Sequence, residues 1–392
     1  MQSDSIVILS ARRTAIGSLL GQFTPVTSPQ LGAAAIRAAL ADSGIRPEEI
    51  GEVIMGCVLP AAVGQAPARQ ASLGAGIPKS VGCTTVNKVC GSGMKATMLA
   101  HDLIVAGSAD IMISGGMESM TNAPHMLHAR AGIKYGESKL IDHMAWDGLT
   151  NPYDGQAMGV CGELCAEKYH FTREQQDAFA MESVKRAQRA IADGSFKAEI
   201  VPVTVKTRKG EISVATDEEP GRCDIAKIPT LKPAFKKVGT VTAASSSSIS
   251  DGAAALVLMR ESEAKKRGLK PLARILGHAS FAQEPVWFTT SPVSAIDRLQ
   301  KKLGWSEKDV DLYEINEAFA VVTMAAMHEL KLPHAKVNVN GGACALGHPI
   351  GCSGARLIVT LLHALKARNL KRGIASLCIG GGEATAIAVE ML

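Results

Sequence analysis

Residues 86 to 116 read VNKVCGSGMKATMLAHDLIVAGSADIMISGG, and this stretch decides the fold. An apolar run ends in a turn of small residues at 90–93, a helix-like segment covers 92–106, and a second apolar run ends at Gly115-Gly116. This order of strand, turn, helix and strand is the βαβ pattern of an α/β protein. Residues 339–382 repeat it, from Val-Asn through a Gly-rich turn and a helix to a strand that ends in three glycines. The two copies predict two similar βα halves.

The rest of the chain alternates apolar runs with helix-like segments in the same way. Strands are expected at residues 6–10, 52–58, 83–87, 110–114, 311–315, 337–340, 373–378 and 384–390. One helix should begin with Ser28 as its cap and Pro29 in its first turn, and end at Gly44; others should cover 67–73, 92–106, 318–330 and 354–367. The alternation predicts an α/β fold with a mostly parallel sheet and helices on both faces.

The middle of the chain lacks this rhythm. Residues 121–149 and 206–248 are irregular, and two helices lie between them, the second with Thr172 and Gln175 as a capping box. Long irregular inserts of this kind usually carry function. We therefore expect an N-terminal βα half at 1–120, an inserted loop region with helices and a return to the N-terminal half at 121–250, and a C-terminal βα half at 251–392.

Composition excludes several classes of protein. The 392 residues are 46% hydrophobic and 20% charged, the balance of a globular chain with two or three domains. A net charge of +5 without a basic run suits an anionic small molecule and does not indicate nucleic-acid binding. Apolar runs are too short for a membrane span. The run Ile6–Leu9 is too short for a signal-peptide core, so we expect a cytoplasmic protein.

The nine cysteines are odd in number and scattered, which argues against a disulfide framework and for a reducing cytosol. Cys161 and Cys165 fall on one face of an expected helix. No further ligands stand at zinc spacing, so packing is their expected role. We expect no metal ion and no bound cofactor.

Two residues, Cys90 and His348, stand at positions that are typical of catalytic groups. Cys90 lies where a strand turns into a helix, and the positive end of the helix stabilises a thiolate there while backbone N–H groups face a developing oxyanion. The alternative is a small buried core cysteine, which is the more common role of a free thiol. His348 lies between Gly347 and Pro349 on a constrained turn, as a general base would, or it is a loop histidine exposed to water.

Two further segments end strands with polar or small residues. Cys378 is followed by the three glycines 380–382, whose backbone N–H groups a substrate could approach, although a thiol in a buried strand is ordinary packing. Asn316 stands at a strand-to-helix junction, either as a functional group or as a helix N-cap.

Taken together these segments resemble the thiolase family, and within it the acetyl-CoA acetyltransferase type, along almost the whole chain. The resembling stretches are Arg13–Gly17, Val86–Met94, Ser114–Met120, Leu231–Phe235, Asp251–Ala254, Asn316–Phe319, Gly341–Gly351 and Cys378–Gly382. The resemblance implies a thiolase-like fold, in which each half has a mixed sheet packed in layers with helices. It also implies a reversible Claisen condensation of two acetyl-CoA molecules to acetoacetyl-CoA.

The resemblance implies a role for each of the singled-out residues. Cys90 resembles the nucleophile that carries the acyl group, His348 the base that activates it, and Cys378 the acid/base at the α-carbon. One oxyanion hole would use His348 and a water held by Asn316, and the other the N–H groups of Cys90 and Gly380.

Coenzyme A should lie over the inserted loops, as substrate and not as a resident cofactor. The family positions for its contacts are Arg222, Ala243, Ser247, Leu149, Met158, Phe235 and Phe319. Residues Pro124–Met144 resemble the loop that joins dimers into tetramers in many members, so a homotetramer is expected.

The chain departs from the family pattern at four places. Gln156-Ala157 precede Met158-Gly159 where short-chain members often have His, and Ala15 replaces a usual proline. Glu383 follows the triple glycine where Met or Gln is usual, and Ser245–Ser248 replace Asn-Ala-Ser-Gly.

Three alternatives stay open at this point. A ketoacyl synthase of the same fold usually carries two histidines with its cysteine, and Cys378 argues against it. A long-chain degradative thiolase would differ in its pocket and not in its catalytic residues. A non-catalytic lipid-binding or scaffold relative would be expected to lack Cys90, His348 or Cys378, and all three are present. A cysteine peptidase fits poorly, because a second thiol before a triple-glycine loop has no role there.

Overall fold

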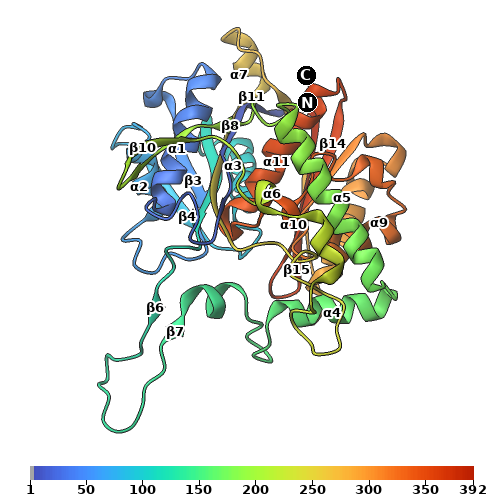
Figure 1. The fold of residues 1–392 in the computed structure, drawn as a ribbon. Helices are drawn as coiled ribbons and strands as arrows, with labels where there is room; N and C mark the ends of the chain where they lie inside the picture. The colour runs from blue at the N-terminus through green and yellow to red at the C-terminus, as the bar shows by residue number, and fades with distance from the viewer. Residues whose placement is uncertain (1–3) are drawn as a thin grey trace.

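A computed structural model describes residues 4–392, and its central feature is one mixed β-sheet surrounded by helices (Figure 1). The order of the sheet is β13-β14-β15-β12-β1-β11-β5-β3-β4. These strands are β1 (Ile6–Thr14), β3 (Glu52–Gly56), β4 (Gly82–Val86), β5 (Ile111–Ser119), β11 (Ser250–Arg260), β12 (Ala273–Ala282), β13 (Leu312–Ile315), β14 (Arg372–Ile379) and β15 (Glu383–Met391). The main helices are α1 (Ser28–Ser43), α2 (Pro67–Gly74), α3 (Ser92–Ala106), α4 (Met158–Tyr169), α5 (Arg173–Ala192), α8 (Ser291–Leu303), α9 (Ala320–Leu330), α10 (Ala343–Leu346) and α11 (Ile350–Ala367).

The sheet is mixed, and the expectation of a mostly parallel sheet was wrong. β3 pairs in parallel with β4 and β5, and β13 with β14. β11 is antiparallel to β1 and β5, and β15 is antiparallel to β12 and β14. The triple-glycine turn between β14 and β15 is too short for a crossover, so these two strands can only form an antiparallel hairpin.

The two halves repeat one strand order, as the sequence copies predicted. The N-terminal half runs β1-β11-β5-β3-β4, and the C-terminal half runs β12-β15-β14-β13. A fifth position in the C-terminal half is marked by Val337, which forms a single parallel bridge to Tyr313 of β13. Each strand position of one half thus has its counterpart in the other. The two halves join through β1, which also pairs with β12.

The strand expected at 337–340 is absent among the described residues because a side chain replaces it. Asn338 has a left-handed φ of 48°. Its Oδ1 accepts a hydrogen bond from the Ile315 N–H at 2.8 Å, and its Nδ2 donates to the Ile315 carbonyl at 2.8 Å. The amide therefore satisfies the edge of β13 in place of a neighbouring backbone.

The strand pairing also moves the boundary between the halves. The expected boundary at residue 251 falls within β11, and β11 lies between β1 and β5 of the N-terminal half. The chain therefore returns to the first half through Arg260 before the second half begins.

Helices α3 and α11 lie in the middle of the molecule. α3 packs on β3, β5 and β11, while α11 contacts β5 and β11 of one half and β13 and β14 of the other. α1 covers the outer face of the N-terminal half, and α8 covers that of the C-terminal half. By length and composition α11 could cross a membrane, but 83% of it is buried inside the protein. It is the central core helix, and its burial explains its apolar sequence.

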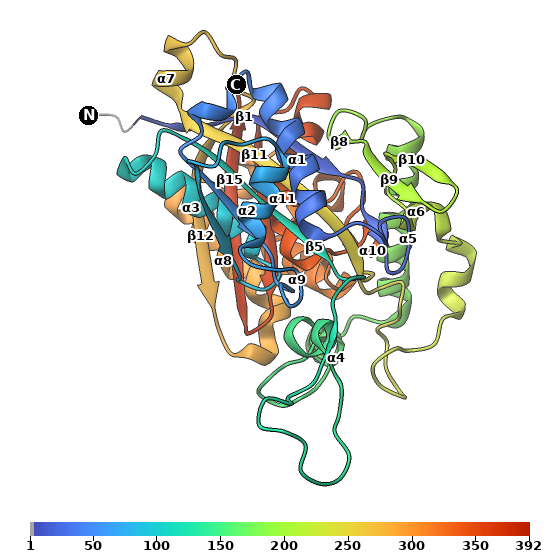
Figure 2. The same ribbon diagram turned by 90° about the vertical axis from the view of Figure 1, so that its left-hand side faces the viewer.

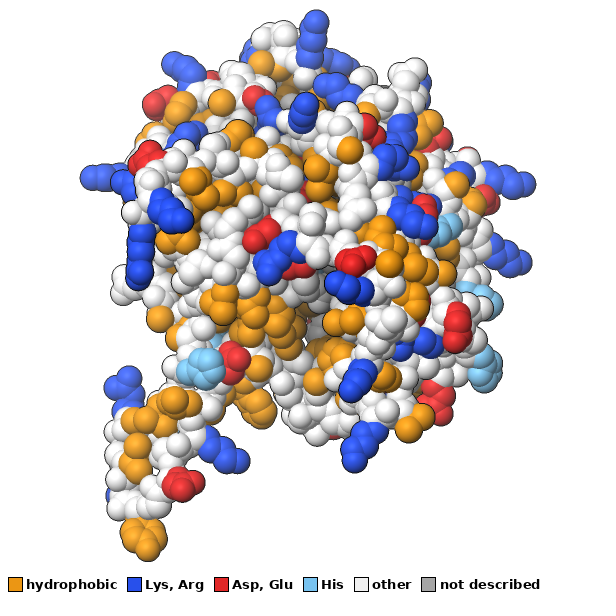
Figure 3. Space-filling model, viewed as in Figure 1, with side chains coloured by type: hydrophobic (Ala, Val, Ile, Leu, Met, Phe, Trp, Pro, Cys, Tyr) orange, Lys and Arg blue, Asp and Glu red, His pale blue; other side chains and the backbone are white. Residues whose placement is uncertain are grey.

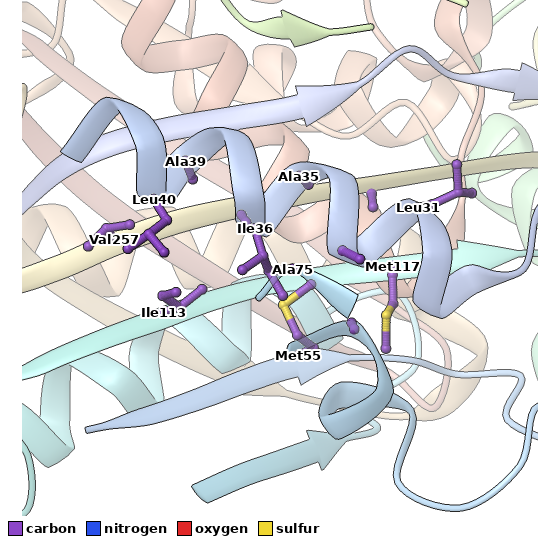
Figure 4. Close-up of a cluster of buried hydrophobic side chains, with 14 of the residues drawn as sticks. Leu31, Ala35, Ile36, Ala39, Leu40, Met55, Ala75, Ile113, Met117 and Val257 are labelled. Carbon is purple, nitrogen blue, oxygen red and sulfur yellow. The ribbon is translucent and has the colours of Figure 1, made fainter. Parts of the chain in front are cut away.

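The outer layer of the N-terminal half is packed by one face of α1 (Figure 4). Ile36 and Leu40 are four residues apart on this helix, and Leu40 lies beside Ile113 of β5 and Val257 of β11. Burying each such side chain contributes about 1.5–3 kcal/mol to stability.

The ends of α1 agree only in part with the sequence prediction. The N-cap is Thr27 and not Ser28, because Gln30 Oε1 accepts a hydrogen bond from the Thr27 N–H at 2.8 Å. Gly44 ends the helix with a φ of 72°, as expected. The capping box of Thr172 and Gln175 on α5 is confirmed.

The glycines of β5 had been expected to end the strand, but they serve close packing within it instead. β5 continues through Gly115-Gly116 to Ser119. A Cβ atom at Gly116 would lie only 2.0 Å from the carbonyl oxygen of Gly351. The start of α11 therefore rests directly on the strand.

The inserted region forms two distinct parts. Residues 121–149 contain the short strands β6 (His125–Met126) and β7 (Ile141–Asp142) and project from the body in both views (Figures 1 and 2). The second part carries α4 and α5, and Cys161 and Cys165 of α4 are buried in an apolar cluster, which confirms their packing role.

Candidate active site

Two helix starts meet at one point in the molecule. Cys90 comes just before α3, and His348 comes just before α11. The two helices cross at Gly93 and Gly354, where an added Cβ atom would lie 2.8 and 2.4 Å from backbone nitrogens of the other helix. Because neither position has a side chain, the helix starts approach closely. Cys90 of one half and His348 of the other consequently line the same cavity.

The turn before α3 is strained. Val89 has a φ of 46°, a left-handed conformation that is rare for a β-branched residue. Asn87 Oδ1 accepts a hydrogen bond from the Val89 N–H at 2.9 Å. The Ser92 hydroxyl accepts from the Lys88 N–H at 2.8 Å and donates to the Val89 carbonyl at 2.6 Å. These bonds hold the turn that carries Cys90. The sequence predicted where this turn lies but not its backbone conformation.

The surroundings of Cys90 shift the pKa of its thiol in opposite directions. Loss of surrounding water raises its pKa to about 11, and this outweighs hydrogen bonds from the N–H groups of Gly380 and of Cys90 itself, which lower it. The carboxylate of Glu118 adds a smaller upward shift. Cys90 is therefore a neutral thiol near pH 7. The two N–H groups also provide a pair of donors where an oxyanion would form beside the sulfur.

The tautomer of His348 follows from its hydrogen bonds. Its Nδ1 lies 2.5 Å from the Oγ of Ser353, and this hydroxyl donates to the Pro349 carbonyl at 2.9 Å. Since the hydroxyl has one proton, Nδ1 must donate to it, and Nε2 keeps a lone pair. Burial lowers the pKa of His348 to about 3, and the positive charge of Arg356 contributes. The imidazole is therefore neutral and can accept a proton through Nε2.

Cys378 and Asn316 lie beneath the cavity wall. Cys378 is the last but one residue of β14 and is fully buried, and burial followed by the nearness of Cys90 raises its pKa well above the ordinary value. Asn316 is not a helix N-cap, because Phe319 has that position on α9. Its Nδ2 lies 3.5 and 3.4 Å from the two ring nitrogens of His348, too far for strong hydrogen bonds. Its buried Oδ1 has no partner among the described residues, which suits a bound water.

The cavity has a volume of about 290 Å³ and mostly apolar walls. Of the predicted contacts, it is lined by Leu149, Met158, Phe235, Ser247 and Phe319, together with Cys90, His348 and Gly380. Sequence reasoning missed further lining residues, namely Ser246, Ile249, Phe288 and Ile350. Phe319 is held edge-on between Phe235 and Phe288, with ring centroids 5.8 and 6.4 Å apart. On the face seen in Figure 3, hydrophobic side chains gather around a hollow beside the base of the projecting segment.

Arg222 and Ala243 lie outside this cavity. They line a neighbouring cavity of about 310 Å³, and Ser246 lines both. Arg222 is paired with Glu218 at 3.2 Å and is more than half exposed. The predicted contacts thus divide between two adjoining cavities, of which the one lined by Arg222 is the more polar.

Two departures from the family pattern have physical explanations in the structure. Glu383 forms an ion pair with Lys88, so it links the start of β15 to the turn that carries Cys90. The Ser247 hydroxyl donates to the Ala318 carbonyl at 3.0 Å, and Ser246 forms a bridge with Phe319. Ser246 and Ser247 therefore bind this loop to the segment that follows β13.

Comparison with known proteins agrees with this arrangement. Residues 6–262 match the family model "Thiolase, N-terminal domain", and residues 269–391 match "Thiolase, C-terminal domain". Acetyl-CoA acetyltransferase 2 of Arabidopsis thaliana is 50% identical over 99% of this chain and 97% of its own.

Two solved structures are also similar. Acat5 thiolase from Ascaris suum in complex with coenzyme A has a TM-score of 0.94 and 43% identity, and the match covers 99% of this chain and 100% of that one. The acetyl-CoA acetyltransferase of Bacillus anthracis has a TM-score of 0.97 and 41% identity, with 100% and 99% covered. With both halves matched and a cysteine and a histidine at the two helix starts, the chain belongs to the thiolase family.

Proposed function

We propose that this chain is an acetyl-CoA C-acetyltransferase, which condenses two acetyl-CoA molecules to acetoacetyl-CoA and coenzyme A and catalyses thiolysis in reverse. One observation carries the proposal: the Cys90 thiol, the imidazole of His348 and the Gly380 N–H border one apolar cavity. The names of the similar proteins support acetyl-CoA as the substrate.

In the first half of the reaction Cys90 becomes acylated. Its sulfur attacks the thioester carbonyl while its proton passes to Nε2 of His348, and the Cys378 thiol would give its own proton to the departing coenzyme A sulfur and so become a thiolate. The N–H groups of Cys90 and Gly380 would stabilise the oxyanion of the tetrahedral intermediate. Loss of one such donor typically lowers the rate about a hundred- to a thousandfold.

In the second half a carbon–carbon bond forms. The Cys378 thiolate would remove a proton from the α-carbon of the second acetyl-CoA, and the resulting enolate would attack the acyl group on Cys90, whose sulfur leaves and takes back the proton held on Nε2 of His348. The enolate oxygen would face His348 and a water bound to Asn316. The Ser353 hydroxyl goes on accepting from Nδ1, so the imidazole would carry both protons in this step and its Nε2–H would face the enolate oxygen.

We also propose a homotetramer acting in the cytoplasm in lipid metabolism. The expected tetramer loop, Pro124–Met144, is the projecting segment, and it exposes Leu127, Ile133, Tyr135 and Leu140. An exposed apolar segment of this kind is typical of a surface between subunits. The nine free thiols suit a reducing compartment.

A broader-range 3-ketoacyl-CoA thiolase is the second candidate, and one observation favours it. Ala157 lines the cavity beside Met158 and Gly159, where short-chain relatives often carry a histidine. A small apolar side chain there leaves room for a longer acyl chain.

The test is thiolysis by the purified protein with free coenzyme A, comparing acetoacetyl-CoA with longer 3-ketoacyl-CoAs. Cleavage of acetoacetyl-CoA alone supports the first candidate, and faster cleavage of longer substrates supports the second. The control is Cys90→Ala, which should abolish both. No cleavage by well-folded protein would overturn the enzymatic proposal and leave a non-catalytic acyl-CoA-binding relative.

A further inference from the structure

Three potential metal ligands meet on the side of the molecule where the two halves are joined. His101 and Asp102 belong to α3 of the N-terminal half, and His278 belongs to β12 of the C-terminal half. Their donor atoms all lie within 4.8 Å of one another. Asp102 and His278 are 176 positions apart in the chain, so a search for short ligand spacings could not find the site.

A hydrogen-bonded arrangement already holds the three side chains together. Asp102 Oδ1 lies 3.0 Å from Nδ1 of His101 and 2.9 Å from Nε2 of His278. The two rings meet edge to face with centroids 5.2 Å apart. Two ligands about 2.1 Å from one ion stand roughly 2.9–3.4 Å apart, so the nitrogen–oxygen separations already match those of bound ligands.

The supporting elements are rigid and the site is open to solvent. His278 lies within β12, whose register with β15 pairs it with Ile387. The two histidine side chains are 18% and 15% exposed, whereas that of Asp102 is 51% exposed. An ion can enter past Asp102, and water would complete its coordination.

We propose that His101, Asp102 and His278 bind one divalent transition-metal ion of the zinc class. Two imidazoles and one carboxylate are ligands that such ions favour over magnesium or calcium. The ring protons would move to the outer nitrogens, so each ring would present a lone pair from His101 Nδ1 and His278 Nε2. The bound ion would tie α3, the helix that follows Cys90, to the opposite half.

The test uses the full untagged protein after treatment with a chelator. Titration with Zn²⁺ should show one site per chain, and the thermal midpoint should rise by several degrees at saturation. Asp102→Asn keeps the size of the side chain and removes its charge, so it should weaken binding at least tenfold. His278→Gln should do the same. Lys302, whose Nζ lies 3.4 Å from the His278 carbonyl, adds an unfavourable positive charge, and Lys302→Gln should tighten binding severalfold.

Cysteine sites are the main competitor, because thiolates also bind zinc. The Co²⁺ complex should therefore lack thiolate-to-metal absorption. His170→Gln, which changes an exposed histidine elsewhere, is the matched control and should bind zinc as the parent does. Unchanged zinc affinity in both Asp102→Asn and His278→Gln, or no zinc binding by the parent protein at millimolar concentration, would overturn the proposal.

Discussion

Replacing Ser353 by alanine should slow catalysis while leaving substrate binding intact. The Ser353 hydroxyl accepts from His348 Nδ1 at 2.5 Å and donates to the Pro349 carbonyl at 2.9 Å. Both Ser353 and His348 are buried, so water does not readily take the place of the hydroxyl. Alanine would leave the Nδ1–H of the productive tautomer without a partner and favour the tautomer in which Nε2 is protonated and cannot act as a base.

The size of the effect follows from this loss. A buried donor left unsatisfied costs about 1–3 kcal/mol. If that cost is borne by the tautomer with a free Nε2, the acylation rate falls about 5- to 150-fold. The effect should appear in kcat, because Ser353 does not line the cavity, and KM should change little.

The assay is steady-state thiolysis of acetoacetyl-CoA, combined with ¹⁵N chemical shifts of His348, which report the tautomer. Cys352→Ala is the matched control, since Cys352 is the buried neighbour in the same turn of α11. A kcat within about twofold of the parent, with the tautomer unchanged, would refute the argument that Ser353 positions the base. A loss of kcat equal to that of the control would assign the effect to packing.

Three other changes test the framework of the site. Gly382→Ala should lower the thermal midpoint by several degrees, because φ is 90° there and an added Cβ would lie 2.3 Å from a backbone oxygen of the facing loop. In Gly380→Ala the added Cβ would meet nothing closer than 3.5 Å, so kcat should stay within about threefold of the parent value. Arg13→Met should cost about 3–5 kcal/mol of unfolding free energy in denaturant titrations, because it leaves two buried carboxylates unpaired. The low pKa of His348 predicts that stability present above pH 6.5 is lost as pH falls toward 3, by about 2 kcal/mol between pH 6.5 and 5, and that His348→Ala removes this part of the slope.

Each of these outcomes has a clear contrary result. Equal midpoints for the two glycine variants would mean that the triple-glycine turn is not strained. A neutral effect of Arg13→Met would show that the buried ion pairs contribute little beyond their own desolvation. An unchanged pH slope in His348→Ala would assign the acid sensitivity to other groups. Glu118 would not mimic it, because burial raises its pKa to about 7 and its contribution to stability has the opposite sign.

The duplicated halves and the helix start at Cys90 could be predicted because their signals are local, whereas α11 begins at Ile350 and not at residue 354 as expected. A strand, a small-residue turn and an apolar helix follow one another around Cys90, and the same order recurs around His348. Such a pattern fixes which residues stand at a helix start before any tertiary contact is known. It predicted α3 to the residue.

Features that depend on tertiary contacts could not be read in this way. Asn338 replaces a strand because its amide meets the backbone of Ile315, and no propensity encodes that contact. The link between Glu383 and Lys88 joins residues 295 positions apart. Ser353 was not singled out in the sequence, and only its hydrogen bond in the folded structure relates it to His348.

The resting state of the site places a condition on how the nucleophile forms. With pKa values of about 11 for Cys90 and about 3 for His348, transfer of the proton from thiol to imidazole costs about 11 kcal/mol before the new charges attract each other. The attraction between two unit charges in contact recovers roughly 4 kcal/mol at the effective dielectric constant of a protein site. The neutral pair is therefore lower in free energy than the charged pair at rest, by several kcal/mol. The resting pair is therefore neutral, and the proton moves as the sulfur attacks, when the N–H groups of Cys90 and Gly380 stabilise the charge on the carbonyl oxygen. Catalysis then depends on Nε2 being unprotonated at that moment, which is the condition that the Ser353 hydroxyl maintains.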